Sequence, residues 1–211
     1  MNLQEQLLEY ANTSANRIPK PALEIMKSAI KQLEISTANE TFLKTGFKLP
    51  NVTLMNHLGT AINLYDALQK SSLVITFYRG GWCPYCNLQL QAFQKHLTEI
   101  KDKGGRLIAI TPEHVDHSLS TLEKNNLGFD ILTDTNNTYA KSLNLSYKLP
   151  DNLVTLYKQF GIDLDKSQLN TKNELPISAT YVVDQSGEVK YHFVVPDYKL
   201  RAPIEAVLNA L

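Results

Sequence analysis

Residues Leu73–Cys86 read LVITFYRGGWCPYC, and this stretch decides the fold. The apolar run at its start predicts a buried central strand, and the amphipathic residues beyond it predict a helix. Cys83 and Cys86, the only two cysteines, therefore stand at a strand-to-helix junction. A cysteine at a helix start faces free backbone N–H groups and the positive end of the helix dipole, and both favour the thiolate. The pattern predicts thiol redox chemistry, with Cys83 as the nucleophile and Cys86 as the resolving thiol.

Two mechanisms suit a nucleophilic and a resolving thiol one helical turn apart. In the first, the Cys83 thiolate attacks the O–O bond of a peroxide and becomes a sulfenic acid, which condenses with Cys86 to a disulfide. In the second, the pair exchanges electrons with protein disulfides through a mixed disulfide. Both use the same two residues in the same roles, so the motif alone leaves both open.

The composition is that of an ordinary soluble protein large enough for one well-packed domain. Of 211 residues, 43% are hydrophobic and 20% are charged, and 21 basic residues balance 21 acidic ones. This balance gives no reason to expect a nucleic acid or a membrane surface as partner. Met1–Gln6 lacks the pattern of a secretory signal, and the apolar run of Leu73–Tyr78 is too short to cross a bilayer. We expect a cytoplasmic protein, in which a cysteine pair is catalytic or metal-binding rather than a structural disulfide.

Helices and strands alternate along the chain in a way that predicts an α/β fold. The expected strands are residues 52–54, 73–78, 106–110, 129–132, 180–183 and 189–194, and the expected helices are residues 3–11, 21–35, 88–100, 114–124, 137–144, 153–160 and 203–211. The order predicts a thioredoxin-like fold over residues 47–211, with a central mixed sheet flanked by helices. Residues 1–46 are expected to form an N-terminal helical extension that serves as a docked arm or a dimer contact. Residues 145–177 are expected either to shape the substrate pocket or to cover a sheet edge, and we favour the second role.

The residues around the cysteines have expected roles in holding a substrate. Gly80 and Gly81 let the backbone approach the reacting centre closely, and the backbone of Gly81 is expected to contact a peroxide. Trp82 is expected to exclude water beside Cys83. Arg79 is expected either to stabilise the thiolate or a bound oxyanion, or to form a surface ion pair.

A zinc site is the structural alternative for a pair of cysteines three residues apart. Tetrahedral zinc needs two further ligands, and the chain has no other cysteine. The only close histidine pair is His114 and His117, which stand at the expected start of a surface helix. We therefore expect neither a metal nor a cofactor.

Residues Tyr78–Asn87, reading YRGGWCPYCN, closely resemble the peroxiredoxin-like branch of the alkyl hydroperoxide reductase/thiol-specific antioxidant (AhpC/TSA) family. Shorter segments support the resemblance, namely Ile110–Glu113, Leu132–Asp134, Leu175–Asp184 and the closing residues Asp197, Tyr198, Arg201 and Pro203. It extends over residues 47–211. The resemblance implies a thioredoxin-like fold and a peroxidase that reduces hydrogen peroxide or organic hydroperoxides at Cys83. It also implies electrons from thioredoxin or a similar dithiol donor, and a homodimer remains an open expectation.

Three positions depart from the pattern of that family. Thr76 and Gly80 stand where typical members carry proline and threonine, and the missing threonine hydroxyl helps to orient the peroxide in those members. Ser178 replaces an arginine of the typical enzymes, and it also replaces the cis-proline of other thioredoxin-fold oxidoreductases. The missing threonine and arginine favour the alternative, a thiol–disulfide oxidoreductase acting on protein disulfides, whereas the missing cis-proline and the lack of a secretory signal count against it. A redox sensor ranks last, because a disulfide within one helical turn moves little.

Four further side chains complete the expected site. Thr76 and Ser178 are expected to line the substrate pocket, while Tyr78 is expected to belong to the core of the strand. Tyr85, which lies between the cysteines, is expected to be exposed where a reductase docks.

Overall fold

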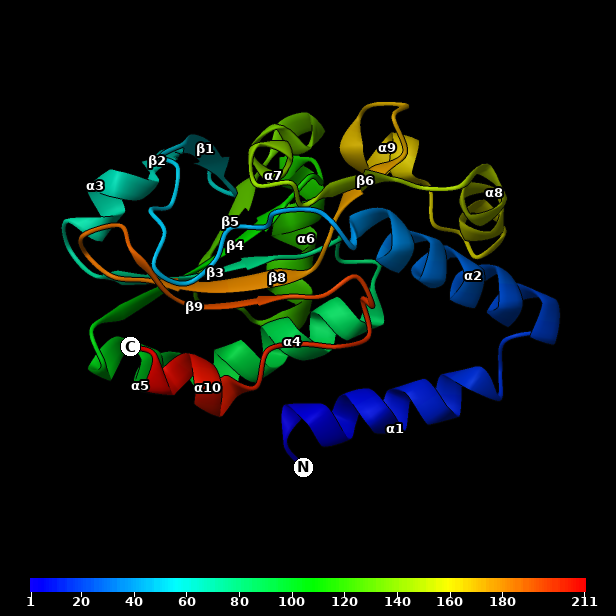
Figure 1. Cartoon of the computed structure of the whole chain (residues 1–211), viewed down its shortest axis with the longest axis horizontal. Coiled ribbons are helices and arrows are strands. Elements are labelled where there is room, and N and C mark those ends of the chain that lie inside the picture. The colour runs from blue at the N-terminus through cyan, green and yellow to red at the C-terminus, as the bar shows by residue number, and fades with distance from the viewer.

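The computed structural model describes residues 1–211 and has a seven-stranded sheet with helices on both faces (Figure 1). The strands of this sheet follow the order β2-β1-β5-β4-β3-β8-β9, and β6 and β7 form a separate pair. In chain order the elements are α1 (Leu3–Ala15), α2 (Lys20–Thr37), β1 (Thr53–Asn56), β2 (Ala61–Asn63), α3 (Leu64–Leu68), β3 (Ser72–Phe77), α4 (Pro84–Lys95), α5 (Leu97–Asp102), β4 (Gly105–Thr111), α6 (Val115–Asn125), β5 (Asp130–Thr133), η1 (Thr135–Asn137), α7 (Thr138–Ser142), β6 (Ser146–Lys148), α8 (Asp151–Gln159), α9 (Leu164–Gln168), β7 (Glu174–Pro176), β8 (Ala179–Val183), β9 (Val189–Val194) and α10 (Ile204–Asn209).

The main sheet is mixed, as predicted. Strands β3, β4 and β5 run parallel to one another, whereas β8 pairs antiparallel with β3, and β9 pairs antiparallel with β8. At the other edge, β1 pairs antiparallel with both β2 and β5. Strand β3 thus lies in the interior of the sheet, and its carboxyl end leads directly into the cysteine motif.

Both faces of β3 are buried, because its side chains alternate between two hydrophobic clusters. Leu73, Ile75 and Phe77 pack on one face against residues of α3 and α7. Val74 packs on the other face against residues of α4, α5 and α10, and Tyr78 follows the strand into the same cluster. None of these side chains is exposed, as expected for an interior strand of an α/β sheet. The two clusters hold the end of β3 in place, and with it the start of α4.

The predicted helix over residues 88–100 is two helices in the structure. α4 ends and α5 begins around His96, whose φ of −102° and ψ of 12° leave the helical range. The apolar face that predicted the helix still packs as one surface, because Leu90, Phe93 and Ile100 are all fully buried. Gly104 then follows α5 with a φ of +76°, a left-handed conformation that suits glycine after a helix end.

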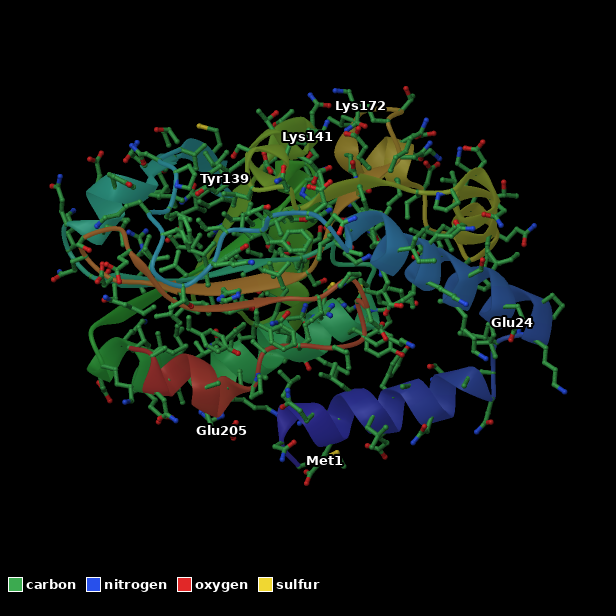
Figure 2. All side chains as sticks on the ribbon, viewed as in Figure 1. Met1, Glu24, Tyr139, Lys141, Lys172 and Glu205 are labelled. Atoms are coloured by element: carbon green, nitrogen blue, oxygen red, sulfur yellow. The ribbon has the colours of Figure 1, made fainter.

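The N-terminal extension is docked on the rest of the chain. Leu3 and Leu7 of α1 belong to the same cluster as the buried face of α4, and Leu33 of α2 belongs to the cluster on the opposite face of the sheet. α1 also contacts α4, and α2 contacts α8. Figure 1 shows α1 and α2 meeting at one end of the molecule, and Figure 2 labels Met1 at the start of α1 and Glu24 on α2.

The expectation that residues 145–177 cover a sheet edge is wrong. The edge strands of the main sheet are β2 and β9, and the start of β9 is covered by residues 46–49, where Gly46 donates to the carbonyl of Val189 and Val189 donates to that of Phe47. Residues 145–177 form instead the small β6-β7 sheet, α8 and α9, and they pack beside α2. The apolar residues of this segment predicted that it packs against another part of the chain, but the periodicity of the sequence does not identify that part.

Candidate active site

The cysteine motif occupies the loop and first helical turn that follow β3. Cys83 is the residue before α4, with an extended backbone, and Pro84 is the first helical residue, where its missing N–H has no helical partner to lose. Gly80 has a φ of +151°, and a Cβ there would lie 2.8 Å from the Glu113 carboxyl group. The turn between β3 and α4 therefore requires glycine at this position.

Both sulfur atoms are buried, but they face different surroundings. Cys83 is 1% exposed and Cys86 is not exposed. Cys83 lies on the wall of a cavity of about 290 Å³, and Cys86 does not line it. A small molecule in this cavity would meet Cys83 first.

Each cysteine has its own buried arginine. Nη1 of Arg79 lies 3.9 Å from Sγ of Cys83, and Nη2 of Arg201 lies 3.4 Å from Sγ of Cys86. The two arginines are 2% and 3% exposed, and neither forms an ion pair with a carboxylate. A buried guanidinium without an anionic partner is costly, so both arginines favour negative charge on the sulfur atoms.

Aromatic rings and a hydroxyl fix the position of Arg79. Its guanidinium carbon lies 4.1 Å from the centre of the Tyr198 ring, 5.0 Å from that of Trp82 and 5.7 Å from that of Tyr157. These distances fall within the range of cation–π attraction. Nη2 also donates a hydrogen bond to the Tyr157 hydroxyl. The surface ion pair considered for Arg79 is therefore wrong, because the side chain is buried beside Cys83.

The two thiols share a hydrogen bond, and their pKa values shift in opposite directions. Burial raises the pKa of Cys86, but the hydrogen bond with Cys83 and the charges of Arg201 and Arg79 outweigh it and lower that pKa to about 5. Burial raises the pKa of Cys83, and so does its hydrogen bond to Cys86. The low pKa of Cys86 favours its thiolate near neutral pH, whereas the raised pKa of Cys83 favours its thiol.

Glu113 supports the turn from the next loop of the sheet. It follows β4, is 2% exposed, and accepts a 2.7 Å hydrogen bond from the backbone N–H of Gly81. Burial raises its pKa from an ordinary 4.5 to about 7, although the hydrogen bond from Gly81 opposes that change. A separate, more polar hollow on the other side of the turn is lined by Gly81, Trp82 and Glu113.

The remaining predicted residues lie close to the motif in different ways. Trp82 lines the cavity beside Cys83, as expected for a residue that excludes water. Thr76 is buried under α4, where its hydroxyl is 3.3 Å from that of Thr180, and it does not line the cavity. Ser178 precedes β8 and is 3% exposed; its hydroxyl has no hydrogen-bond partner, and it does not line the cavity either.

The expectation of an exposed Tyr85 is wrong. Its side chain is 7% exposed, because its ring packs edge-on against Tyr10 of α1 at 5.1 Å and against Tyr198 at 5.7 Å. The N-terminal helix covers the position between the cysteines that was expected to receive a reductase. Tyr78 is fully buried in the core, as expected.

Three residues near the cysteines were not predicted as site residues, and they come from distant parts of the sequence. Arg201 follows β9, Tyr157 lies on α8, and Glu113 follows β4. Arg201 and Glu113 did occur in segments that resemble the family, which was the only signal for them. Nothing in the sequence around Tyr157 separates it from an ordinary apolar residue of an amphipathic helix.

No helix has the combination of length and apolar character that a membrane span requires. No group of three or more His, Cys, Asp or Glu side chains is placed to hold a metal ion.

Comparison with known proteins places this geometry in context. The sequence model of the AhpC/TSA family matches residues 45–192. Peroxiredoxin Bcp of Escherichia coli K12 is 23% identical over 169 residues, which cover 80% of this chain and 96% of that protein. Peroxidoxin BcpB from Mycobacterium tuberculosis is similar in structure, with a TM-score of 0.63 and 17% identity over 80% of this chain and 96% of its own. Reduced Prx3 from Vibrio vulnificus, in complex with H2O2, has a TM-score of 0.63 and 17% identity over 80% of this chain and 98% of its own.

Proposed function

This chain belongs to the AhpC/TSA family, and from that premise we propose that it reduces hydroperoxides through a Cys83 sulfenic acid that Cys86 resolves. The observation that carries the proposal is the position of Cys83, which has its own arginine and lies on the wall of a cavity. The comparisons support a peroxiredoxin-type enzyme, and the geometry supports the roles of the two cysteines.

The first step needs a thiolate at Cys83. The proton of Cys83 moves to the Cys86 thiolate along the hydrogen bond that couples the pair, and the Arg79 guanidinium 3.9 Å away favours the charge that develops on Cys83. Its sulfur attacks the terminal oxygen of the hydroperoxide. The S–O bond forms, the O–O bond breaks, and the leaving alkoxide takes up a proton to become an alcohol, or water when the substrate is hydrogen peroxide.

The second step needs a thiolate at Cys86. Arg201 lies 3.4 Å from its sulfur and lowers its pKa, so that thiolate is available at neutral pH once the excess proton has left. Cys86 attacks the sulfenic sulfur, the S–S bond forms, and hydroxide leaves and is protonated to water. The two residues lie within the first turn of α4, so this disulfide closes within one helical turn.

We propose that thioredoxin or a similar dithiol restores the pair. Both sulfur atoms are buried, and Tyr85 is covered by α1, so the first turn of α4 has to open before a reductase thiol reaches the disulfide. A cytoplasmic location and a homodimer stay predictions.

Stopped-flow fluorescence tests the proposal, because Trp82 is the only tryptophan and lies beside Cys83. Reduced protein is mixed with hydrogen peroxide or cumene hydroperoxide, and Cys83→Ser and Cys86→Ser are measured in parallel. We expect a response orders of magnitude faster than that of a free thiol, absent in Cys83→Ser. In Cys86→Ser we expect a sulfenic acid that a dimedone adduct reveals by mass spectrometry. A slow response in the wild type would favour disulfide exchange with protein substrates instead.

A further inference from the structure

The N-terminal helices contribute eight of the 19 residues that line the cavity beside Cys83. Its volume is about 290 Å³, and 14 of its 19 lining residues are hydrophobic. Cys83 and Arg79 lie on one side of it, and the opposite wall carries Ala11 of α1 together with Leu23 and Met26 of α2. The reactive sulfur thus faces an apolar chamber and not open solvent.

This chamber is larger than hydrogen peroxide requires. A water molecule takes a share of about 30 Å³ in the liquid, so the chamber has room for about ten such volumes. Hydrogen peroxide is fully polar and gains little from apolar walls, whereas an apolar group gains free energy with each methylene that leaves water.

The charges at the chamber select the kind of molecule that fits it. Arg79 is the one buried charge on its wall, and it lies beside the reacting sulfur. The two lysines on the wall, Lys27 and Lys199, are already paired with Glu24 and Asp197. A neutral apolar tail therefore matches the chamber better than an anionic one.

Both helices precede the part of the chain that matches the family, which begins at residue 45. Seven of the 14 hydrophobic lining residues therefore come from the N-terminal extension, and the family match does not account for these seven.

Resting on the proposed peroxidase function, we propose that α1 and α2 form a specificity subsite for the apolar tail of an alkyl or aryl hydroperoxide. The tail lies between the two helices, and the peroxide group points to Cys83 and Arg79. The S–O bond forms and the O–O bond breaks as above, and the bulky alcohol leaves through the same chamber. The extension thus selects the substrate, in addition to its packing role.

Steady-state peroxidase assays with a thioredoxin system test the proposal on the full chain. The value of kcat/KM is measured for hydrogen peroxide and for cumene hydroperoxide, in the wild type and in Ala11→Phe, which fills the chamber from α1. Thr13→Phe is the matched control, because Thr13 is exposed on the same helix and does not line the chamber. We expect the wild type to prefer cumene hydroperoxide by ~10-fold or more, since one group that fits an apolar pocket changes kcat/KM by about 10- to 200-fold.

In Ala11→Phe we expect kcat/KM for cumene hydroperoxide to fall ~10-fold or more, while that for hydrogen peroxide changes less than about threefold. Thr13→Phe should leave both values unchanged. If Ala11→Phe does not fold, Leu23→Asn tests the same wall from α2 by making it polar, with the same expected split between the two substrates.

Three results would overturn the subsite. An equal loss for both hydroperoxides would mean that the chamber does not discriminate between them. A higher KM for thioredoxin, with unchanged peroxide kinetics, would make the chamber a reductase contact. A wild type that favours hydrogen peroxide would refute the subsite and leave the peroxidase function intact, whereas inactivity toward both hydroperoxides would refute the peroxidase function itself.

Discussion

Replacing Arg201 with glutamine should raise the pKa of the cysteine pair. The guanidinium lies 3.4 Å from Sγ of Cys86, and two unit charges at that distance attract by ~5 kcal/mol at an effective dielectric constant of about 20, equal to ~3.5 pKa units. Arg79 remains in the variant, and water enters the space that is left, so the expected rise is ~1–3 units. The pKa of about 5 at Cys86 would move to between ~6 and ~8.

Thiolate absorbance in the ultraviolet, followed from pH 4 to pH 10, measures this pKa directly. The rate of iodoacetamide alkylation over the same range gives an independent value. Arg201 also donates hydrogen bonds to the carbonyl groups of Tyr198 and Leu200, so circular dichroism has to show that the variant is folded. Arg106→Gln removes a cation that pairs with Asp130 away from the cysteines, and it should leave the titration unchanged. A folded Arg201→Gln protein whose pKa differs from the wild type by less than about half a unit would refute the role of this charge.

Three further predictions concern stability. The pKa of Glu113 is raised from 4.5 to about 7, so the folded protein keeps a proton that the unfolded chain loses between these pH values. The free energy of unfolding should therefore fall by ~3 kcal/mol as the pH rises through this window. Urea titrations of Glu113→Gln should show no such dependence on pH. Gly80→Ala should destabilise the protein by ~1–3 kcal/mol more than Gly104→Ala. Both glycines have a positive φ, but only a Cβ at position 80 would lie against Glu113. Equal midpoints of urea unfolding for the two variants would contradict this steric explanation. Asp134 accepts 2.9 Å hydrogen bonds from two backbone N–H groups at the start of α7. Asp134→Ala should therefore lower the free energy of unfolding by ~1–3 kcal/mol and lower the melting temperature accordingly. An unchanged melting temperature would show that these hydrogen bonds are dispensable.

The sheet and the position of the cysteine motif at the end of its central strand could be predicted because the signals are local. Apolar runs identified the central strands, and alternating strands and helices identified the fold class. The register that pairs Phe77 with Ala179 places residue 178 beside the end of β3, as the resemblance to the family implied. Short elements such as β2, α3, β6 and β7 have three to five residues each and carry too little periodicity to be recognised.

The surroundings of the cysteines depend on long-range contacts, which periodicity does not reveal. The Tyr157 hydroxyl bonds to Arg79 across 78 positions, and Arg201 contacts Cys86 across 115. The burial of Tyr85 depends on its contact with α1, and the position of α1 depends on hydrophobic contacts with residues far away in the sequence.

The contact between Arg201 and Cys86 also bears on how the protein matures during synthesis. Translation produces the cysteine motif long before Arg201, which lies 115 positions beyond Cys86. Until that last segment docks, Cys86 lacks the neighbour that most directly lowers its pKa after the hydrogen bond from Cys83. A nascent chain therefore holds at this position a thiol without its arginine, and the low pKa of Cys86 arises only after the segment that carries Arg201 has been made and has docked.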